Sequence, residues 1–232
     1  MTSTNTSCAP YDHLAELKAF DDIKADVKGL VDTGVTIAPC IFHHPPDLHH
    51  VDMSSSSSHH VSYTIPVIDM LAAGVVRYEL VARVKEAVET AGFYQVVNHG
   101  VPETVMWKML TAVQGFTEEP AKVKRPYYTR DAGRRVRDIV LEYTRPVHSL
   151  CSALLELLSE AMGLHRGRLE HDSGCMDWLN VAAHYYPPCP EPHLTVGTAK
   201  HSDAMFLTVL FQAGPSPSVE GPGAKPKTGS QI

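Results

Sequence analysis

The spacing of apolar residues changes once along this chain, and that change restricts the possible folds more than any other feature of the sequence. Before Asp177, apolar residues recur every three or four positions over long stretches, as on the buried face of an α-helix. After Asp177 the pattern becomes that of strands, first at 179–186, where Pro187 and Pro188 end the run, and then within 197–212. Helices followed by strands predict the α+β class.

The helical part begins at 11–31, where apolar residues predict the buried stripe of one or two helices that end near Gly34. Gly92 and Gly163 are expected to end two later helices. The later helices are predicted at about 80–91, 105–116 and 138–162. The residues expected to be buried are Phe93, Val96, Val105, Met109, Phe116, Leu154 and Leu158.

Pro146 lies inside the predicted helix 138–162, and a proline in a helix interior costs about 3 kcal/mol. We therefore expect either a kink or a later start of that helix. Two short strands are predicted before it, at 65–69 and 93–98, because both runs are rich in β-branched and aromatic residues.

The chain divides into four predicted segments. A helical segment with a loop rich in histidine and serine covers 1–62, a mainly helical domain covers 63–165, and a β portion covers 166–212. The tail 213–232 contains no aromatic residue and is dominated by glycine, proline and serine. It is predicted to be disordered, because it cannot bury enough apolar surface to offset the entropy of ordering it.

Charge and composition exclude several classes of protein. The formal net charge is -6, and no basic run is longer than Arg134–Arg135, so nothing indicates a nucleic-acid or membrane partner. Apolar runs fall far short of the roughly 18 residues that span a bilayer, and the N-terminus does not resemble a secretion signal. Five cysteines without a C-x-x-C pair predict reduced thiols and a cytoplasmic protein.

His201-Ser202-Asp203 is the candidate metal site. Residues two apart in a strand point to the same face, so the imidazole and the carboxylate could bind one metal ion. They would supply two thirds of the facial triad that holds non-haem iron(II). The spacing alone is weak, since about one His-x-Asp match is expected by chance and His50-Val51-Asp52 matches as well. It leaves a metal site and an ordinary polar strand end both open.

Longer sequence motifs, around this pair and earlier in the chain, bear on the choice between a metal site and a polar strand end. The runs 181–192 (VAAHYYPPCPEP) and 197–203 (GTAKHSD) closely resemble the plant 2-oxoglutarate- and iron(II)-dependent dioxygenases. The runs 65–69 (IPVID) and 92–102 (GFYQVVNHGVP) resemble the same family in the same order. The run 124–131 (KRPYYTRD) is similar to one branch, the 1-aminocyclopropane-1-carboxylate oxidase homologues and the benzoxazinoid-glucoside dioxygenase.

The resemblance implies a helical N-terminal region, including the family's N-terminal domain at 63–165, packed on a double-stranded β-helix, or jelly roll, begun by 166–212. It implies Fe(II) and 2-oxoglutarate as cofactors, with ascorbate as activator. His201 and Asp203 match the first two iron ligands, and no catalytic residue beyond the metal ligands is implied. Tyr186 matches the tyrosine that helps to hold the distal carboxylate of 2-oxoglutarate. The implied reaction is oxidative decarboxylation of 2-oxoglutarate coupled to hydroxylation of a small plant specialised metabolite.

Two histidines near these motifs have other expected roles. His184 stands where many relatives have asparagine, and the sequence leaves open whether it has a function or is a partly buried strand residue. His99, in the Asn98-His99-Gly100 string, is expected to belong to a structural turn.

The chain also departs from the family pattern. The third iron ligand should be a histidine roughly fifty residues after the pair, on a later strand. Only 31 residues follow His201, none of them histidine, and no arginine for the 2-oxoglutarate carboxylate follows Arg168. Arg137 also runs directly into Asp138, where relatives have about forty more residues. We therefore expect an internally deleted, C-terminally truncated chain whose incomplete roll leaves an unpaired apolar edge near 205–211.

Two hypotheses follow for function. The chain is an oxidoreductase acting on a small molecule, with water or a partner subunit in place of the missing ligand, or it is a non-catalytic relative with a binding or interfering role. For this chain we expect impaired catalysis. The sequence leaves its oligomeric state open.

Overall fold

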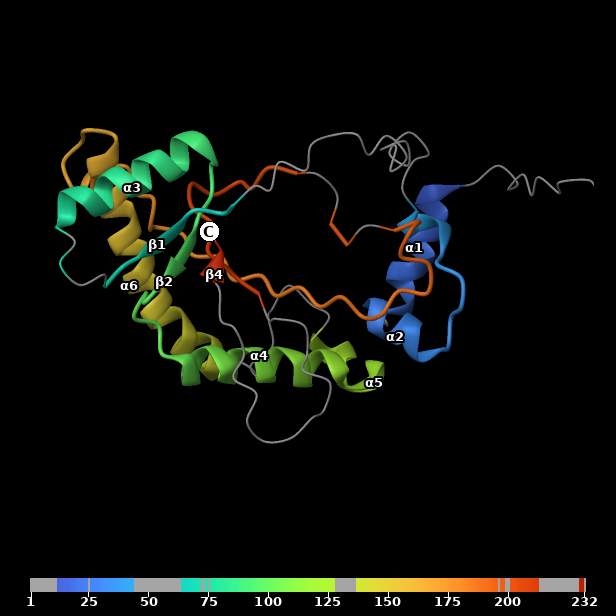
Figure 1. Cartoon of the computed structure of the whole chain (residues 1–232). Coiled ribbons are helices and arrows are strands. Elements are labelled where there is room, and N and C mark those ends of the chain that lie inside the picture. Colours follow the sequence, from blue (N-terminus) through green and yellow to red (C-terminus); the bar gives the residue numbers. More distant parts are fainter. Residues whose placement is uncertain are drawn as a thin grey trace, which may run out of the picture. The chain divides into compact units, whose positions relative to one another are not determined.

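Figure 1 shows the helices and strands of the computed structural model. The structure describes residues 12–24, 26–43, 64–71, 74, 76–127, 137–195, 197–198, 201–212 and 230–231. The chain forms two compact units, each built from separate stretches of sequence. The first unit comprises 1–59, 114–133 and 183–200, and the second comprises 60–113, 134–182 and 201–232. The predicted segment boundaries at 62, 165 and 212 stay predictions.

The second unit is built around helix α6 (Arg137–Ala161), which packs against α3 (Arg77–Thr90). Both helices end as the sequence predicts. The amide of Gly92 donates to the carbonyl oxygens of Ala87 and Val88, and Gly92 has a φ of +76°, which favours glycine. Gly163 has a similar φ of +73° just after α6.

Helix α6 is continuous through Pro146. The expectation of a later start is therefore wrong, because the helix begins at Arg137, nine residues before the proline. Its C-terminal half buries an apolar face in the core, and we attribute the tolerance of Pro146 to this burial. The buried residues on that half include Leu150, Cys151, Leu154, Leu155 and Leu157.

A small sheet packs beside these helices. Strand β1 (Val67–Asp69) runs parallel to β2 (Gln95–Val97), with Ile68 opposite Val96. Both of these side chains are buried in the cluster formed with α3 and α6. The strands are shorter than the predicted 65–69 and 93–98, and Phe93, predicted to be buried, is exposed. It precedes β2, whereas the neighbouring Tyr94 points into the core.

The sheet is completed by pairings that the sequence does not predict. Strand β4 (Ser230–Gln231) pairs antiparallel with β2, and β3 (Leu210–Phe211) pairs antiparallel with β4, giving the order β1-β2-β4-β3. β4 lies in the interval predicted to be disordered, and the rest of that interval falls outside the described residues. β3 is an edge strand with one paired side, and the ring of Phe211 stacks on Tyr143 with centroids 6.4 Å apart.

The predicted strand at 179–186 is wrong. These residues have no regular structure, and no strand of the described chain pairs with them. Within 197–212, β3 is the one strand in the described residues. The α+β class therefore holds, but most of the predicted β portion is irregular.

The first unit contains α1 (His13–Ile23), α2 (Asp26–Asp32) and α5 (Ala121–Lys124), with 3-10 turns at Cys40–Phe42 and Arg125–Tyr127. Helix α4 (Glu103–Glu118) is divided between the two units at residue 113. The helices predicted within 11–31 are confirmed, but their buried stripe is wrong. Leu14 and Ile23 are exposed, and α1 buries no residue; in the described residues its packing includes the edge-on pair of Phe20 and Phe42.

Six other residues were predicted to be buried, and half of them are. Val96, Met109 and Leu154 are buried as expected, whereas Val105, Phe116 and Leu158 are only half-buried. A membrane-spanning helix would need a longer and more apolar run than any helix in the described residues provides.

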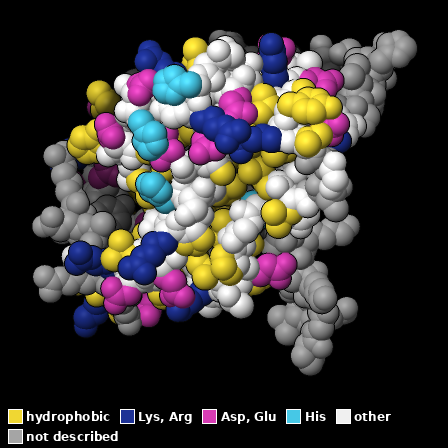
Figure 2. Space-filling model, turned by 90° about the vertical axis from the view of Figure 1, so that its left-hand side faces the viewer, with side chains coloured by type: hydrophobic (Ala, Val, Ile, Leu, Met, Phe, Trp, Pro, Cys, Tyr) yellow, Lys and Arg dark blue, Asp and Glu magenta, His cyan; other side chains and the backbone are white. Residues whose placement is uncertain are grey.

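Charged side chains of both signs alternate on the surface. Arg77 of α3 reaches Glu156 at 2.7 Å and Glu160 at 3.0 Å on α6, and Glu160 also contacts Arg166. Figure 2 shows basic and acidic side chains interspersed on one face, with hydrophobic side chains between them. Such pairs fix the register of α3 on α6 and contribute little stability where they are exposed.

Tyr94 carries an unpaired polar atom in the core of the second unit. Its side chain is buried, its hydroxyl has no hydrogen-bond partner among the described residues, and burial raises the pKa of Tyr94 to about 12. Because a buried hydroxyl without a partner costs free energy, we expect Tyr94→Phe to raise the free energy of unfolding by about 1 kcal/mol.

Urea denaturation followed by circular dichroism measures this change. The matched control is Tyr78→Phe, which removes an exposed hydroxyl on α3 and should change stability by less than about 0.5 kcal/mol. A loss of stability in Tyr94→Phe would show that the hydroxyl does have a partner.

Candidate functional site

The structure brings His201 and Asp203 together. The imidazole Nε2 lies 3.2 Å from the carboxylate Oδ1. Two ligand atoms bound side by side to one metal ion at about 2.1 Å each are roughly 3 Å apart, so this spacing suits a shared ion. It also suits an ordinary ion pair. The pair lies in an irregular segment rather than in the predicted strand, and its side chains are 59% and 47% exposed.

Thr208 orients the carboxylate of the pair. Its hydroxyl donates to Asp203 Oδ2 at 2.7 Å, which leaves Oδ1 facing His201. Carboxylates that bind metals are commonly fixed by such a second hydrogen bond. Thr208 was not predicted from the sequence, because a five-residue separation in an irregular segment has no fixed geometry and so leaves no sequence signal.

The residues present do not fit a complete facial triad. No group of three histidine, cysteine, aspartate or glutamate side chains that could hold a metal ion occurs among the described residues. An imidazole nitrogen and a carboxylate oxygen are donors that iron(II) accepts, but two donors fill only part of its coordination shell. The pair therefore suits two neighbouring coordination positions of a metal ion. The third protein ligand of the triad does not occur in the described residues.

Tyr186 lies in the first unit, whereas His201 and Asp203 lie in the second. Its hydroxyl is 2.6 Å from the hydroxyl of Thr198, so the two form a pair of polar groups. A Cβ on Gly197 would come within 2.6 Å of the Tyr186 ring, so the glycine allows ring and backbone to approach closely.

The two other histidines differ from each other. The ring of His184 stacks on Tyr186 with centroids 6.3 Å apart and is exposed, so the alternative of a partly buried strand residue is wrong. The Nδ1 atom of His99 accepts a hydrogen bond from the amide of Val101 at 3.1 Å, and burial lowers the pKa of His99. This contact lies within the segment expected to form a structural turn.

The turn at His99 also connects β2 to the end of β1. Asn98 donates to Asp69 Oδ1 at 2.8 Å, and this bond, with a second from the amide of Leu71, lowers the pKa of Asp69. Asn98 has a φ of +52°, a conformation that asparagine adopts more readily than most residues. The motif therefore holds β1 and β2 in register.

Comparison with known proteins gives two family matches. Residues 65–160 match the family described as non-haem dioxygenase in morphine synthesis N-terminal. Residues 178–223, which include Tyr186, His201 and Asp203, match the 2OG-Fe(II) oxygenase superfamily.

Three curated relatives are similar over most of the chain. A probable 2-oxoacid dependent dioxygenase of Arabidopsis thaliana is 36% identical, with 87% of this chain and 66% of that protein covered. Deacetoxyvindoline 4-hydroxylase of Catharanthus roseus is 38% identical, with 86% and 59% covered. 1-aminocyclopropane-1-carboxylate oxidase homolog 1 of Arabidopsis thaliana is 36% identical, with 91% and 68% covered. The chain spans less than two thirds of the length of the first two relatives.

Proposed function

Because the chain belongs to the plant 2-oxoglutarate- and iron(II)-dependent dioxygenase family of the 2OG-Fe(II) oxygenase superfamily, we propose that His201 and Asp203 are two iron ligands of an incomplete site. The observation that carries this proposal is the 3.2 Å contact between His201 Nε2 and Asp203 Oδ1. Iron(II) in this family supplies the activation of oxygen, coupled to decarboxylation of 2-oxoglutarate. The residues of this chain would bind and orient the iron and the cosubstrate.

We assign Tyr186 to the distal carboxylate of 2-oxoglutarate. The hydroxyls of Tyr186 and Thr198 lie 2.6 Å apart, and both could donate to one carboxylate. Neutral donors form bonds about half as strong as those from a charged arginine. No arginine follows Arg168 in the sequence, so the polypeptide 1–232 should hold 2-oxoglutarate weakly.

The full activity proposed from the family is hydroxylation of a small plant specialised metabolite, with ascorbate as activator. We propose that 166–212 corresponds to the first part of the jelly roll. For the polypeptide 1–232 we favour the second candidate function, a non-catalytic relative with a binding or interfering role. The specific observation behind it is that, among the described residues, no third histidine, cysteine, aspartate or glutamate joins the exposed pair in a group that could hold a metal ion. A cytoplasmic location remains a prediction from composition.

The test of the iron pair is anaerobic titration of the polypeptide 1–232 with Fe(II), or with Co(II) followed by its visible absorption. We expect weak saturable binding that His201→Ala weakens at least tenfold, because it removes one of two donors. Thr208→Val should weaken it by about tenfold, as loss of a hydrogen bond to a metal-binding carboxylate commonly does.

The matched control is His50→Ala, since His50-Val51-Asp52 has the same spacing and lies outside the described residues. We expect His50→Ala to leave binding unchanged. Binding lost in His50→Ala and retained in His201→Ala would contradict the assignment.

A further inference from the structure

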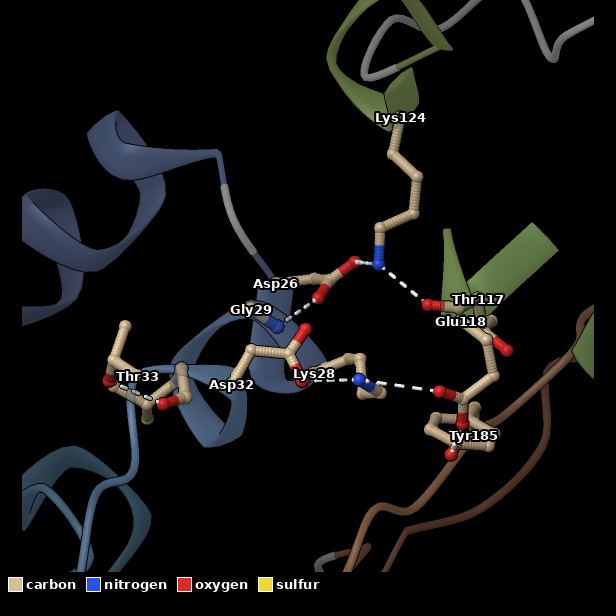
Figure 3. A network of polar contacts seen from close by, with 10 residues as sticks. Asp26, Lys28, Gly29, Asp32, Thr33, Thr117, Glu118, Lys124 and Tyr185 are labelled. Carbon is tan, nitrogen blue, oxygen red and sulfur yellow. Dashed lines mark hydrogen bonds and ion pairs between the residues drawn. The ribbon is translucent and has the colours of Figure 1, made fainter. Parts of the chain in front are cut away.

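A chain of polar contacts in the first unit joins α2, the end of α4 and the segment that carries Tyr186 (Figure 3). Lys28 Nζ contacts Asp32 one turn along α2 and lies 3.3 Å from Glu118 Oε2 at the end of α4. The hydroxyl of Tyr185 donates to the other oxygen of Glu118. Glu118 therefore receives a cation on one oxygen and a phenol on the other. We call Lys28, Glu118 and Tyr185 the clasp.

A second set of contacts fixes the helices on which the clasp rests. The ammonium of Lys124 is buried and lies 2.6 Å from Asp26 Oδ2, and it donates to the carbonyl of Thr117 at 2.7 Å. Asp26 Oδ1 accepts from the amide of Gly29 at 2.9 Å. Because Thr117 directly precedes Glu118, Lys124 holds α2 against the end of α4 (Figure 3). Glu118 is thus presented from a fixed backbone.

We propose that Glu118, assisted by Lys28, is a positioning residue for Tyr186. Tyr185 is bound to α4 through Glu118, and its neighbour Tyr186 is bound to Thr198, so the clasp fixes the point from which Tyr186 extends. The inference rests on the proposed function, in which Tyr186 holds 2-oxoglutarate, and adds the residues that set its position. Glu118 lies on α4 and Lys28 lies on α2. Glu118 and its partner Tyr185 are 67 residues apart in the sequence.

The charge states agree with this geometry. The hydrogen bond from Tyr185, followed by that from Lys28, lowers the pKa of Glu118, so its carboxylate stays ionised. The same bond raises the pKa of Tyr185, which keeps the phenol protonated as a donor. Partly exposed ion pairs contribute little to stability. Loss of the clasp should therefore displace Tyr186 without unfolding the unit.

The test is fluorine NMR of the polypeptide 1–232 labelled with 3-fluorotyrosine. The chain has nine tyrosines, and Tyr185→Phe and Tyr186→Phe assign the two resonances of interest. We expect Glu118→Ala to move the Tyr186 resonance by more than its line width while the melting temperature stays nearly constant. Glu118→Gln should restore most of the native position, because its amide oxygen still accepts from Tyr185.

The matched control is Lys18→Ala, which removes an exposed Lys18–Asp22 pair of the same unit and should leave the Tyr186 resonance in place. An unchanged Tyr186 resonance in Glu118→Ala, with a moved Tyr185 resonance, would overturn the proposal. If Glu118→Ala fails to fold, Tyr185→Phe decides, since it removes the clasp and keeps Glu118.

Addition of 2-oxoglutarate separates this proposal from the proposed function. If 2-oxoglutarate leaves the Tyr186 resonance unmoved but Glu118→Ala moves it, the clasp stands and the cosubstrate role of Tyr186 fails. If 2-oxoglutarate moves the resonance equally in wild type and in Glu118→Ala, and the variant alone does not, the clasp fails and the cosubstrate role stands.

Discussion

Leu154→Ala is expected to lower the free energy of unfolding of the second unit by about 3 to 5 kcal/mol. Leu154 lies on α6 with no exposed surface, in the cluster that includes Val84 of α3 and Val96 of β2. Truncation removes buried methyl groups and leaves a cavity that the surrounding helices and strands cannot fill completely. Urea unfolding followed by circular dichroism measures the loss.

Leu141→Ala is the matched control, because it makes the same chemical change on the same helix. Leu141 is 48% exposed, so the expected loss is below about 1 kcal/mol. Equal losses for the two variants would mean that the face of α6 assigned to the core is wrong.

The helices of the second unit could be predicted from the sequence because their signals are local. Apolar spacing marked α3, α4 and α6, and Gly92 and Gly163 marked two ends. Burial was predicted less well. Leu14 has the spacing of a core residue and is exposed, because burial needs a second surface to pack against, and no described residue covers this side chain of α1.

The strands show the same limit more strongly. Residues 179–186 have a strand-like composition but no regular structure, because a strand exists only when a partner supplies a ladder of hydrogen bonds. Conversely, β4 has a composition that predicts disorder and yet pairs with β2 and β3. Pairing between segments far apart in sequence cannot be read from either segment alone.

The candidate site, too, could be predicted only in part from the sequence. The contact between His201 and Asp203 was predicted from strand geometry, and it forms even though the expected strand does not. The link from Thr208 to Asp203 and the clasp at Glu118 come from tertiary structure, so no motif announces them.

The second large effect concerns turnover of 2-oxoglutarate. We expect the polypeptide 1–232 to show almost none. His201 and Asp203 are the two proposed protein ligands, and no third histidine, cysteine, aspartate or glutamate joins them in a metal-binding group within the described residues. The phenol of Tyr186 is neutral and cannot balance the charge of the distal carboxylate as an arginine would. Weak binding of both the metal and the cosubstrate should reduce turnover to background, because the oxygen-dependent reaction needs the two bound together.

One donor of the His201–Asp203 pair can be removed without disturbing the fold, which gives a control for this assay. His201→Ala removes the imidazole from an exposed position, so the fold should survive the change. A comparison of the wild-type polypeptide with this variant therefore reports on the pair and not on unfolding.

The most direct test of the incomplete iron site is succinate release from 2-oxoglutarate by the polypeptide 1–232, in the presence of iron(II) and ascorbate. We predict equal, background-level succinate from wild type and His201→Ala. Succinate above background that disappears in His201→Ala would contradict the account. It would mean that a third ligand reaches the pair, either from another chain or from the histidine-rich residues 44–60.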